Sequence, residues 1–198
     1  MSTHVYGIAA RAAVERARAQ VAALLGAQAP EIIFTGCATE ANNLVIRGAA
    51  HALRQRGRHV ITSAIEHPSV MQPIRLLQAA GWEVTVLPVD AEGRVRVEDL
   101  ERTLRDDTVL VSIMHANNEV GTVQPIQDIA ALTRKRGIVL HCDAAQSLGK
   151  FRCPSTRWVW TCSRWQGPHA GYHRQRTGTQ SALSPAGARS ARNGQAGD

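Results

Sequence analysis

Residues 31–43 read EIIFTGCATEANN, and this stretch decides the class of fold that the chain adopts. Residues 31–35 are mostly apolar or β-branched and predict a short buried strand. Residues 36–38 are a turn of small side chains, and residues 39–56 have the apolar spacing of a helix. A strand that turns directly into a helix is a βα unit, so the sequence predicts an α/β protein.

The same alternation of strands and helices continues along the chain. The pattern predicts further strands at 59–63, 83–89, 108–114 and 138–141, and further helices at 6–25, 69–80, 98–104 and 126–136. Strands that alternate with helices form a mostly parallel sheet with helices on both faces, and such sheets bind ligands at the carboxyl ends of their strands. We therefore expect residues 1–150 to form one α/β domain.

The net charge of +7 belongs almost entirely to the end of the sequence. Residues 1–150 carry 16 Lys and Arg against 15 Asp and Glu, whereas residues 151–198 carry seven arginines and one acid, Asp198. The second segment is rich in Gly, Ser, Arg and Thr and contains little Val, Ile or Leu. Because it can bury too little apolar surface to offset the entropy of ordering, residues 151–198 are predicted to be an unstructured basic tail.

Two features of the sequence bear on the location of the protein. No apolar run reaches the roughly 18 residues that a membrane-spanning helix needs, and residues 1–10 do not form an export signal. The cysteines form no CxxC pair, which argues against a zinc site and favours reduced thiols; they are Cys37, Cys142, Cys153 and Cys162. We therefore expect a cytoplasmic protein without a metal site or membrane contact.

Polar side chains gather after four predicted strands, in segments 35–43, 66–69, 115–121 and 141–146. Taken singly they have ordinary explanations: Thr39 can cap a helix, and His67 and His141 can be structural histidines. Together, a turn with free amides, an imidazole, an amide and a buried carboxylate suit a phosphorylated aromatic cofactor. A carboxylate that keeps a pyridine nitrogen protonated makes the ring an electron sink, which is the requirement of pyridoxal phosphate.

Residues 2–150 resemble the cysteine desulfurases of the class V aminotransferase group, which are fold-type I pyridoxal phosphate enzymes. Four segments carry the resemblance in order and spacing: FTGCATEANN (34–43), EHPSV (66–70), HANNEVGTVQPI (115–126) and HCDAAQSLGK (141–150). The resemblance implies a partial large domain, a homodimer, and a reaction that removes sulfur from L-cysteine. That reaction leaves alanine and a persulfide on an enzyme cysteine, from which acceptor proteins take sulfur for iron–sulfur clusters or tRNA thiolation.

The resemblance also assigns roles to single residues. It implies that Ala38 and Thr39 contact the cofactor phosphate, His67 stacks on the pyridine ring, Asn118 lies near the substrate and ring oxygen, Asp143 pairs with the ring nitrogen, and Gln146 hydrogen-bonds the ring hydroxyl. In the phosphate turn the family usually has Ser-Gly where this chain has Gly36 and Cys37. A side chain with Cβ therefore stands where we expect a positive φ, and phosphate binding is expected to be weaker.

The larger departure concerns the residues that perform covalent chemistry. The family holds its cofactor on a Schiff-base lysine roughly 25 residues after the carboxylate. That count ends near residues 167–170, which read GPHA, and the lysines of this chain are Lys135 and Lys150. No cysteine of the chain matches the persulfide-forming one. The chain is therefore predicted to be catalytically inactive, with weak or absent binding of pyridoxal phosphate.

Residues 152–167 predict a change of reading frame. Read from the third base of each codon, the back-translated segment can encode Val-Pro-Val-Asp-Ala-Leu-Gly-Val-Asp-Leu-Leu-Ser-Leu-Ala-Gly. Because tryptophan has a single codon, Trp158-Val159 forces Gly in this reading and Trp160-Thr161 forces Asp. This shifted reading resembles the family segment that leads to the cofactor lysine. We expect a frameshift near residue 150, genuine or from sequencing, and a sequence truncated relative to the family.

Two other interpretations of function stay open. Within the same group, the loops that distinguish a selenocysteine lyase or an aminotransferase lie outside this sequence. Outside the group, the tail with its arginines and tryptophans resembles a nucleic-acid-binding module in composition, because such side chains contact phosphates and stack on bases. The tail has no recognised nucleic-acid-binding motif, so binding of nucleic acid is not expected.

Overall fold

The computed structural model describes residues 4–148, 159–163 and 171–174. The helices are α1 (Val5–Leu24), α2 (Ala38–Leu53), α3 (Pro68–Ala79), α4 (Val97–Thr103) and α5 (Ile126–Lys135), with a short 3-10 helix η1 at Ala29–Glu31. The strands are β1 (Ile32–Thr35), β2 (His59–Ser63), β3 (Glu83–Leu87), β4 (Thr108–Ser112), β5 (Val139–Asp143), β6 (Val159–Ser163) and β7 (Gly171–Arg174). Every helix and strand predicted from the sequence is present, with ends that differ by a few residues.

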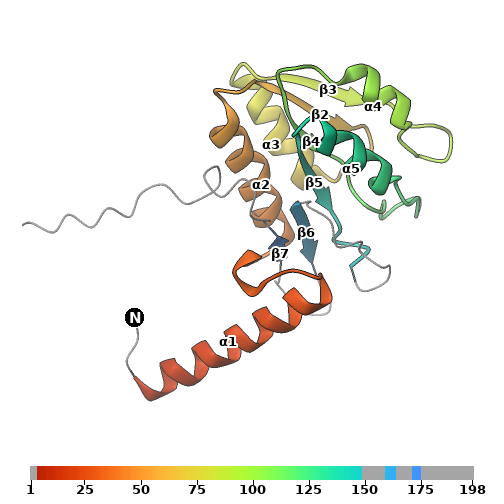
Figure 1. Cartoon of the computed structure of the whole chain (residues 1–198). Coiled ribbons are helices and arrows are strands. Elements are labelled where there is room, and N and C mark those ends of the chain that lie inside the picture. Colours follow the sequence, from red (N-terminus) through yellow and green to blue (C-terminus); the bar gives the residue numbers. More distant parts are fainter. Residues whose placement is uncertain (1–3, 149–158, 164–170, 175–198) are drawn as a thin grey trace, which may run out of the picture.

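The strands form one sheet in the order β1-β7-β6-β5-β4-β2-β3. From β3 to β6 all neighbours pair in parallel, and β7 alone runs antiparallel to both of its neighbours, β6 and β1. The prediction of an α/β fold with a mostly parallel sheet is therefore confirmed. Because the parallel strands point the same way, the loops after β2, β4 and β5 meet at one edge of the sheet (Figure 1).

Two strands lie within the segment that we expected to be unstructured. Residues 159–163 pair with β5, and residues 171–174 pair with β6 and β1, so the prediction of an unstructured tail is corrected at these two segments. The physical reason is that β5 and β1 would otherwise expose rows of unpaired backbone N–H and C=O groups, which any extended segment can satisfy. The amino-acid composition of a segment indicates how much apolar side-chain surface it can bury, but it does not indicate whether its backbone pairs with a neighbouring strand. The other residues of the predicted tail lie outside the described residues.

Helices cover both faces of the sheet, as predicted (Figure 1). Neighbouring residues of a strand face opposite sides. Ile61 and Val111 therefore pack with the core residues of α4 and α5, whereas Val60 and Leu110 pack with those of α2 and α3. All four side chains are fully buried. The apolar runs of these strands are thus explained by burial on two faces.

Helix α1 extends away from the sheet (Figure 1). Its only contribution to the buried core of the described residues is Ala22 near its end, whereas Val5 and Tyr6 near its start are 75% and 80% exposed. Arg18 fastens the helix to β1, because its guanidinium donates to the Ile32 carbonyl and lies 4.8 Å over the ring of Phe34. In the described part of the chain, no helix is long and apolar enough to cross a membrane.

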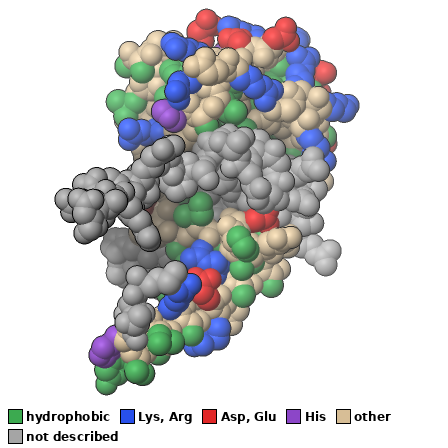
Figure 2. Space-filling model, turned by 60° about the vertical axis from the view of Figure 1, so that its left-hand side comes forward, with side chains coloured by type: hydrophobic (Ala, Val, Ile, Leu, Met, Phe, Trp, Pro, Cys, Tyr) green, Lys and Arg blue, Asp and Glu red, His purple; other side chains and the backbone are tan. Residues whose placement is uncertain are grey.

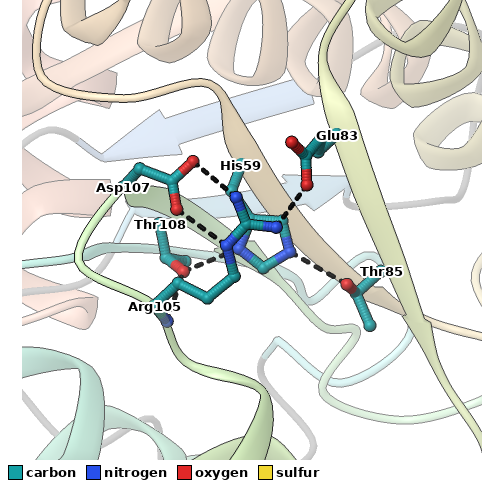
Figure 3. Close-up of polar contacts among 6 residues, drawn as sticks. All are labelled: His59, Glu83, Thr85, Arg105, Asp107 and Thr108. Carbon is teal, nitrogen blue, oxygen red and sulfur yellow. Dashed lines mark hydrogen bonds and ion pairs between the residues drawn. The ribbon is translucent and has the colours of Figure 1, made fainter.

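A buried histidine joins three strands at the amino end of the sheet. His59 begins β2 and is fully buried. Its Nδ1 lies 2.7 Å from Thr108 Oγ1 on β4, and its Nε2 lies 2.9 Å from Thr85 Oγ1 on β3 (Figure 3). A neutral imidazole has one donor and one acceptor nitrogen, and a hydroxyl can serve either. Both ring nitrogens are therefore satisfied without a charge.

The surroundings of His59 favour the neutral ring. Burial is the main cause that lowers the pKa of His59, and the Arg105 guanidinium lowers this pKa further, while Asp107 and Glu83 oppose it. Arg105 pairs with both acids, donating to Asp107 Oδ1 at 2.8 Å and to Glu83 (Figure 3). This network pins the starts of β2, β3 and β4 at the end of the sheet opposite to the predicted site.

We predict that His59 makes the fold sensitive to acid. Because its pKa is lowered in the folded chain below the ordinary 6.5, the unfolded chain binds the proton more readily, and stability is lost as the pH falls below about 6.5. In urea unfolding at about pH 7.5 and about pH 5, His59→Gln should lose less stability on acidification than the native chain. His51→Gln, at an exposed position of α2, should keep the native slope. Equal slopes for the native chain and His59→Gln would contradict the prediction.

Candidate functional site

Asp143 is the last residue of β5 and is 6% exposed. Two donors hold its carboxylate: the Ala145 amide at 2.9 Å from Oδ1, and the Asn42 side chain at 2.9 Å from Oδ2. The first contact fixes the turn after β5, and the second fixes α2 against the end of the strand. The carboxylate predicted from the sequence is therefore in place at the carboxyl edge of the sheet.

A chain of hydrogen bonds continues from Asp143 to His67. Asn42 is fully buried, and its Nδ2 also donates to Ser69 Oγ at 2.8 Å. Ser69 Oγ lies 2.7 Å from His67 Nδ1, and the Ser69 amide donates to the same nitrogen at 3.1 Å. Because Nδ1 accepts from a backbone amide, the proton of the neutral ring is on Nε2. The sequence-predicted residues Asp143 and His67 are thus connected through two residues on α2 and α3.

The predicted phosphate turn leads into α2. Ala38 and Thr39 are the first two residues of this helix, whose first turn leaves backbone N–H groups without partners inside the helix. Thr39 is exposed and does not cap the helix, because the N-cap residue is Cys37 and it makes no side-chain cap. Cys37 has φ −164° and ψ 170°, an extended conformation that any residue adopts. The expectation of a positive φ at Cys37 was therefore wrong, and its Cβ causes no strain.

A carboxylate also lies beside this turn. Glu40 Oε2 accepts a hydrogen bond from the Gly36 amide at 2.6 Å. One turn amide is therefore occupied by an acid of the same helix, which leaves the amides that follow as the donors available to an anion.

A cavity of about 270 Å³ brings His67 and Asn118 together. It is lined by residues 64–68, which follow β2, and residues 117–120, which follow β4. The neighbouring Asn117 rigidifies the second loop, because its Oδ1 accepts from the amides of Glu119 and Val120 at 2.8 and 3.0 Å. Gln146 lies in the exposed turn after β5, three positions beyond Asp143.

His141 has the ordinary role that we left open for it. It is fully buried, and its Nδ1 lies 2.8 Å from Ser112 Oγ on the adjacent strand. Cys142 is buried as a small apolar side chain, and Cys37 is half-buried. Within residues 4–148, 159–163 and 171–174 no group of three or more His, Cys, Asp or Glu could hold a metal ion.

Three residues of this edge were not recognised as site residues from the sequence: Asn42, Glu66 and Ser69. Asn42 and Ser69 link the predicted residues, and Glu66 is a buried acid that lines the cavity with His67. One signal could have identified Asn42 as a site residue. It lies four residues after Ala38, which was predicted to contact the phosphate, and therefore on the same face of the helix. The pairing of α2 with α3 is a tertiary contact, so the sequence alone has no signal for Ser69.

Comparison with known proteins gives a consistent result. The family model "Aminotransferase class-V" matches residues 1–156. A cysteine desulfurase IscS of Dictyoglomus turgidum is 48% identical over 148 residues, which are 75% of this chain and 38% of the relative. The chain therefore spans well under half the length of this curated relative.

Solved structures are similar as well. DndA from Streptomyces lividans superposes with a TM-score of 0.84 at 41% identity, over 89% of this chain and 51% of that chain. A structure of SspA in complex with cysteine gives a TM-score of 0.87 at 35% identity, over 93% of this chain and 55% of that chain.

We predict that the Asn42 amide stabilises the fold through Asp143 and Ser69. Asn42→Ala leaves both partners without their donor and should cost about 1–3 kcal/mol in urea unfolding. Asn42→Asp places a second carboxylate beside Asp143, and two such groups cannot both ionise easily. Its stability should therefore fall further as the pH rises from about 5 to about 8. Asn43→Asp, at the next position of α2, is the control. An Asn42→Asp chain as stable as the native one at the higher pH would refute this role.

Proposed function

Because the chain belongs to the class V aminotransferase family, we propose that it carries the ring-binding part of a pyridoxal phosphate site of the cysteine desulfurase type. The family and the α/β fold confirm the resemblance predicted from the four sequence motifs. One observation carries the proposal: Asp143, at the carboxyl end of β5, is held by Asn42 in the same hydrogen-bond chain as His67. A carboxylate and a fixed imidazole are thereby joined at the edge of the sheet where α/β proteins bind ligands.

The residues of this edge fit the cofactor chemically. Asp143 offers an acceptor for a protonated ring nitrogen, and the first-turn amides of α2 at Ala38 and Thr39 offer donors for a phosphate. His67 is proposed to lie against the ring, and Asn118 and Gln146 are proposed to hold its oxygen substituent. Asn42 Oδ1 is buried without a hydrogen-bond partner among the described residues, so this edge has an unused acceptor on the residue that holds Asp143. When bound, pyridoxal phosphate supplies an electron sink for the bonds of the substrate α-carbon.

The activity of the parent enzyme is part of this proposal. The curated relative is named a cysteine desulfurase and SspA is bound to cysteine, which supports L-cysteine as the substrate class. The parent protein is proposed to form a homodimer in the cytoplasm and to pass sulfur to acceptor proteins through a cysteine persulfide.

We further propose that the chain itself does not catalyse the reaction. Its two lysines are Lys135 and Lys150. Lys135 is exposed at the end of α5, which precedes the start of β5, so it lies at the opposite end of that strand from Asp143. Lys150 lies outside the described residues, and its sequence position, seven residues after Asp143, is far short of the roughly 25 that the family lysine requires.

The proposed frameshift is supported by the extent of the family match. The class V model ends at residue 156, close to the position near residue 150 where the reading frame is proposed to change. Resequencing the gene across the codons for residues 150–152 tests this. A single open frame that encodes the present residues would refute a sequencing error and leave only a frameshift in the gene itself.

We predict weak, non-covalent binding of pyridoxal phosphate by the full chain. Asp143→Asn removes the charge that pairs with the ring nitrogen and should lower the affinity about tenfold or more in a spectroscopic titration. Asp128→Asn, at an exposed position of α5, should leave the affinity unchanged. An affinity equal in Asp143→Asn and the native chain would refute the assigned role.

We also predict that borohydride traps no stoichiometric adduct and that the chain releases no alanine from L-cysteine. Both follow from the absence of a lysine at the family position. Mass spectrometry of the borohydride-treated protein and an amino-acid assay provide the measurements. A stoichiometric adduct on Lys150, or alanine release at a catalytic rate, would overturn the proposal that this chain is inactive.

A further inference from the structure

Glu66 is a buried acid that connects two of the loops at the site. It follows β2, directly precedes His67, and is 8% exposed. Its Oε1 accepts hydrogen bonds from Ser63 Oγ at 2.5 Å and from the Met114 amide at 2.9 Å. Ser63 ends β2 and Met114 follows β4, so one carboxyl oxygen bridges the ends of two adjacent strands.

A second contact joins the same two loops. Asn117 Nδ2 donates to the Ile65 carbonyl at 3.1 Å. Together with the bond from the Met114 amide to Glu66, it fixes residues 64–67 against residues 114–120. These loops carry His67 and Asn118, which line the same cavity. The pair of contacts therefore sets the distance between two residues proposed to contact the cofactor.

The surroundings of Glu66 disfavour a negative charge. Its Oε2 is buried and has no hydrogen-bond partner among the described residues. Burial raises the pKa of Glu66 to about 8, and the charge of Asp143 on β5 acts in the same direction, against the hydrogen bonds from Ser63 and Met114. The other titratable groups that line the cavity are His67 and Glu119. An unpaired polar oxygen costs far less in a neutral acid than in a carboxylate.

We propose that Glu66 is a positioning residue, which as a neutral carboxylic acid holds the loops of His67 and Asn118 together. When it ionises, the cost of a charge on the buried, unpartnered Oε2 outweighs the stronger hydrogen bonds at Oε1, and the carboxylate leaves this position for water and releases the loops. What these loops position rests on the proposed function, whereas the contact itself is made by protein groups alone. Neutral Glu66 also leaves Asp143 as the carboxylate available to a cationic ring nitrogen. A charge on Glu66 would instead repel the charge of Asp143.

The pH dependence of stability tests this in the cofactor-free full chain. An acid whose pKa is raised on folding contributes stability that is present below its unfolded value of 4.5 and is lost as the pH rises through about 8. Glu66→Gln mimics the neutral acid in shape and cannot ionise. The urea midpoint of the native chain should fall between about pH 6 and about pH 9, and Glu66→Gln should lose this fall and exceed the native midpoint above about pH 8.

Two further variants make the outcome specific to Glu66. Glu119→Gln alters an exposed acid of the same cavity and should keep the native profile. Ser63→Ala removes a donor that favours the ionised form, so the fall in midpoint should move to higher pH.

Hydrogen exchange at the Met114 amide reports on the same contact. In the native chain, its rate should rise with pH by more than the intrinsic rate does, whereas in Glu66→Gln it should follow the intrinsic rate. Parallel pH profiles of the native chain and Glu66→Gln, or an unmoved profile in Ser63→Ala, would overturn the proposal.

Titration with pyridoxal phosphate separates this proposal from the proposed function. If the native chain binds no pyridoxal phosphate while Glu66→Gln shows the expected profile, the cofactor site is refuted and the loop contact stands. If the native chain binds pyridoxal phosphate, its affinity should drop between about pH 7 and about pH 9 more than that of Glu66→Gln. Equal drops in the two chains would refute the positioning role while leaving the cofactor site intact.

Discussion

The buried amide of Asn42 holds together the parts from which the site is built. Both of its donor hydrogens are used, one on Asp143 at the end of β5 and one on Ser69 in α3. Asp143 lies 101 positions from Asn42 along the chain, so the contact closes a long loop that contains β2, β3, β4 and β5. Through the Ser69 hydroxyl the same amide is linked to His67 Nδ1, the nitrogen that also accepts from the Ser69 backbone amide. The orientations of an acid and a base at this edge therefore depend on one fully buried side chain.

The two ends of the sheet differ in how completely their buried polar groups are satisfied. At the amino end, the His59 ring has a hydroxyl partner on each nitrogen. At the carboxyl end, Asn42 Oδ1 and Glu66 Oε2 are buried without partners among the described residues. Each unsatisfied buried group costs about 1–3 kcal/mol, and native proteins keep few of them. At the amino end, protein groups satisfy both nitrogens of the buried ring, as in an ordinary structural network. At the carboxyl end two buried acceptors keep their cost, and departures of this kind are typical of functional sites.

The sequence predicted the elements and the edge of the site because both follow from local patterns. Apolar runs in β2 and β4 indicated strands buried on two faces, and Asp143 was predicted at a strand end by its position after such a run. The role of Asn42 was not predicted, because it depends on contacts between elements distant in sequence. Strand β7 was missed for another reason: it pairs through its backbone, which composition does not report. The φ of Cys37 depends on the path of the chain into α2, and motif comparison gave the wrong expectation.

Holding a cofactor ring and anchoring it covalently are separate tasks for this fold. A covalent lysine keeps its ligand at a high effective concentration, so the surrounding contacts need only orient the ring. Without that bond, the carboxylate and the helix amides must also overcome the entropy of association, which a few charge-assisted hydrogen bonds of about 1.5–3 kcal/mol each do only weakly. The hydrogen bonds among Asp143, Asn42, Ser69 and His67 are made between protein groups, so the fold itself sets the geometry of this edge. The relative positions of Asp143 and His67 are thus set by the packing of α2 and α3 on the sheet, independently of any covalent anchor.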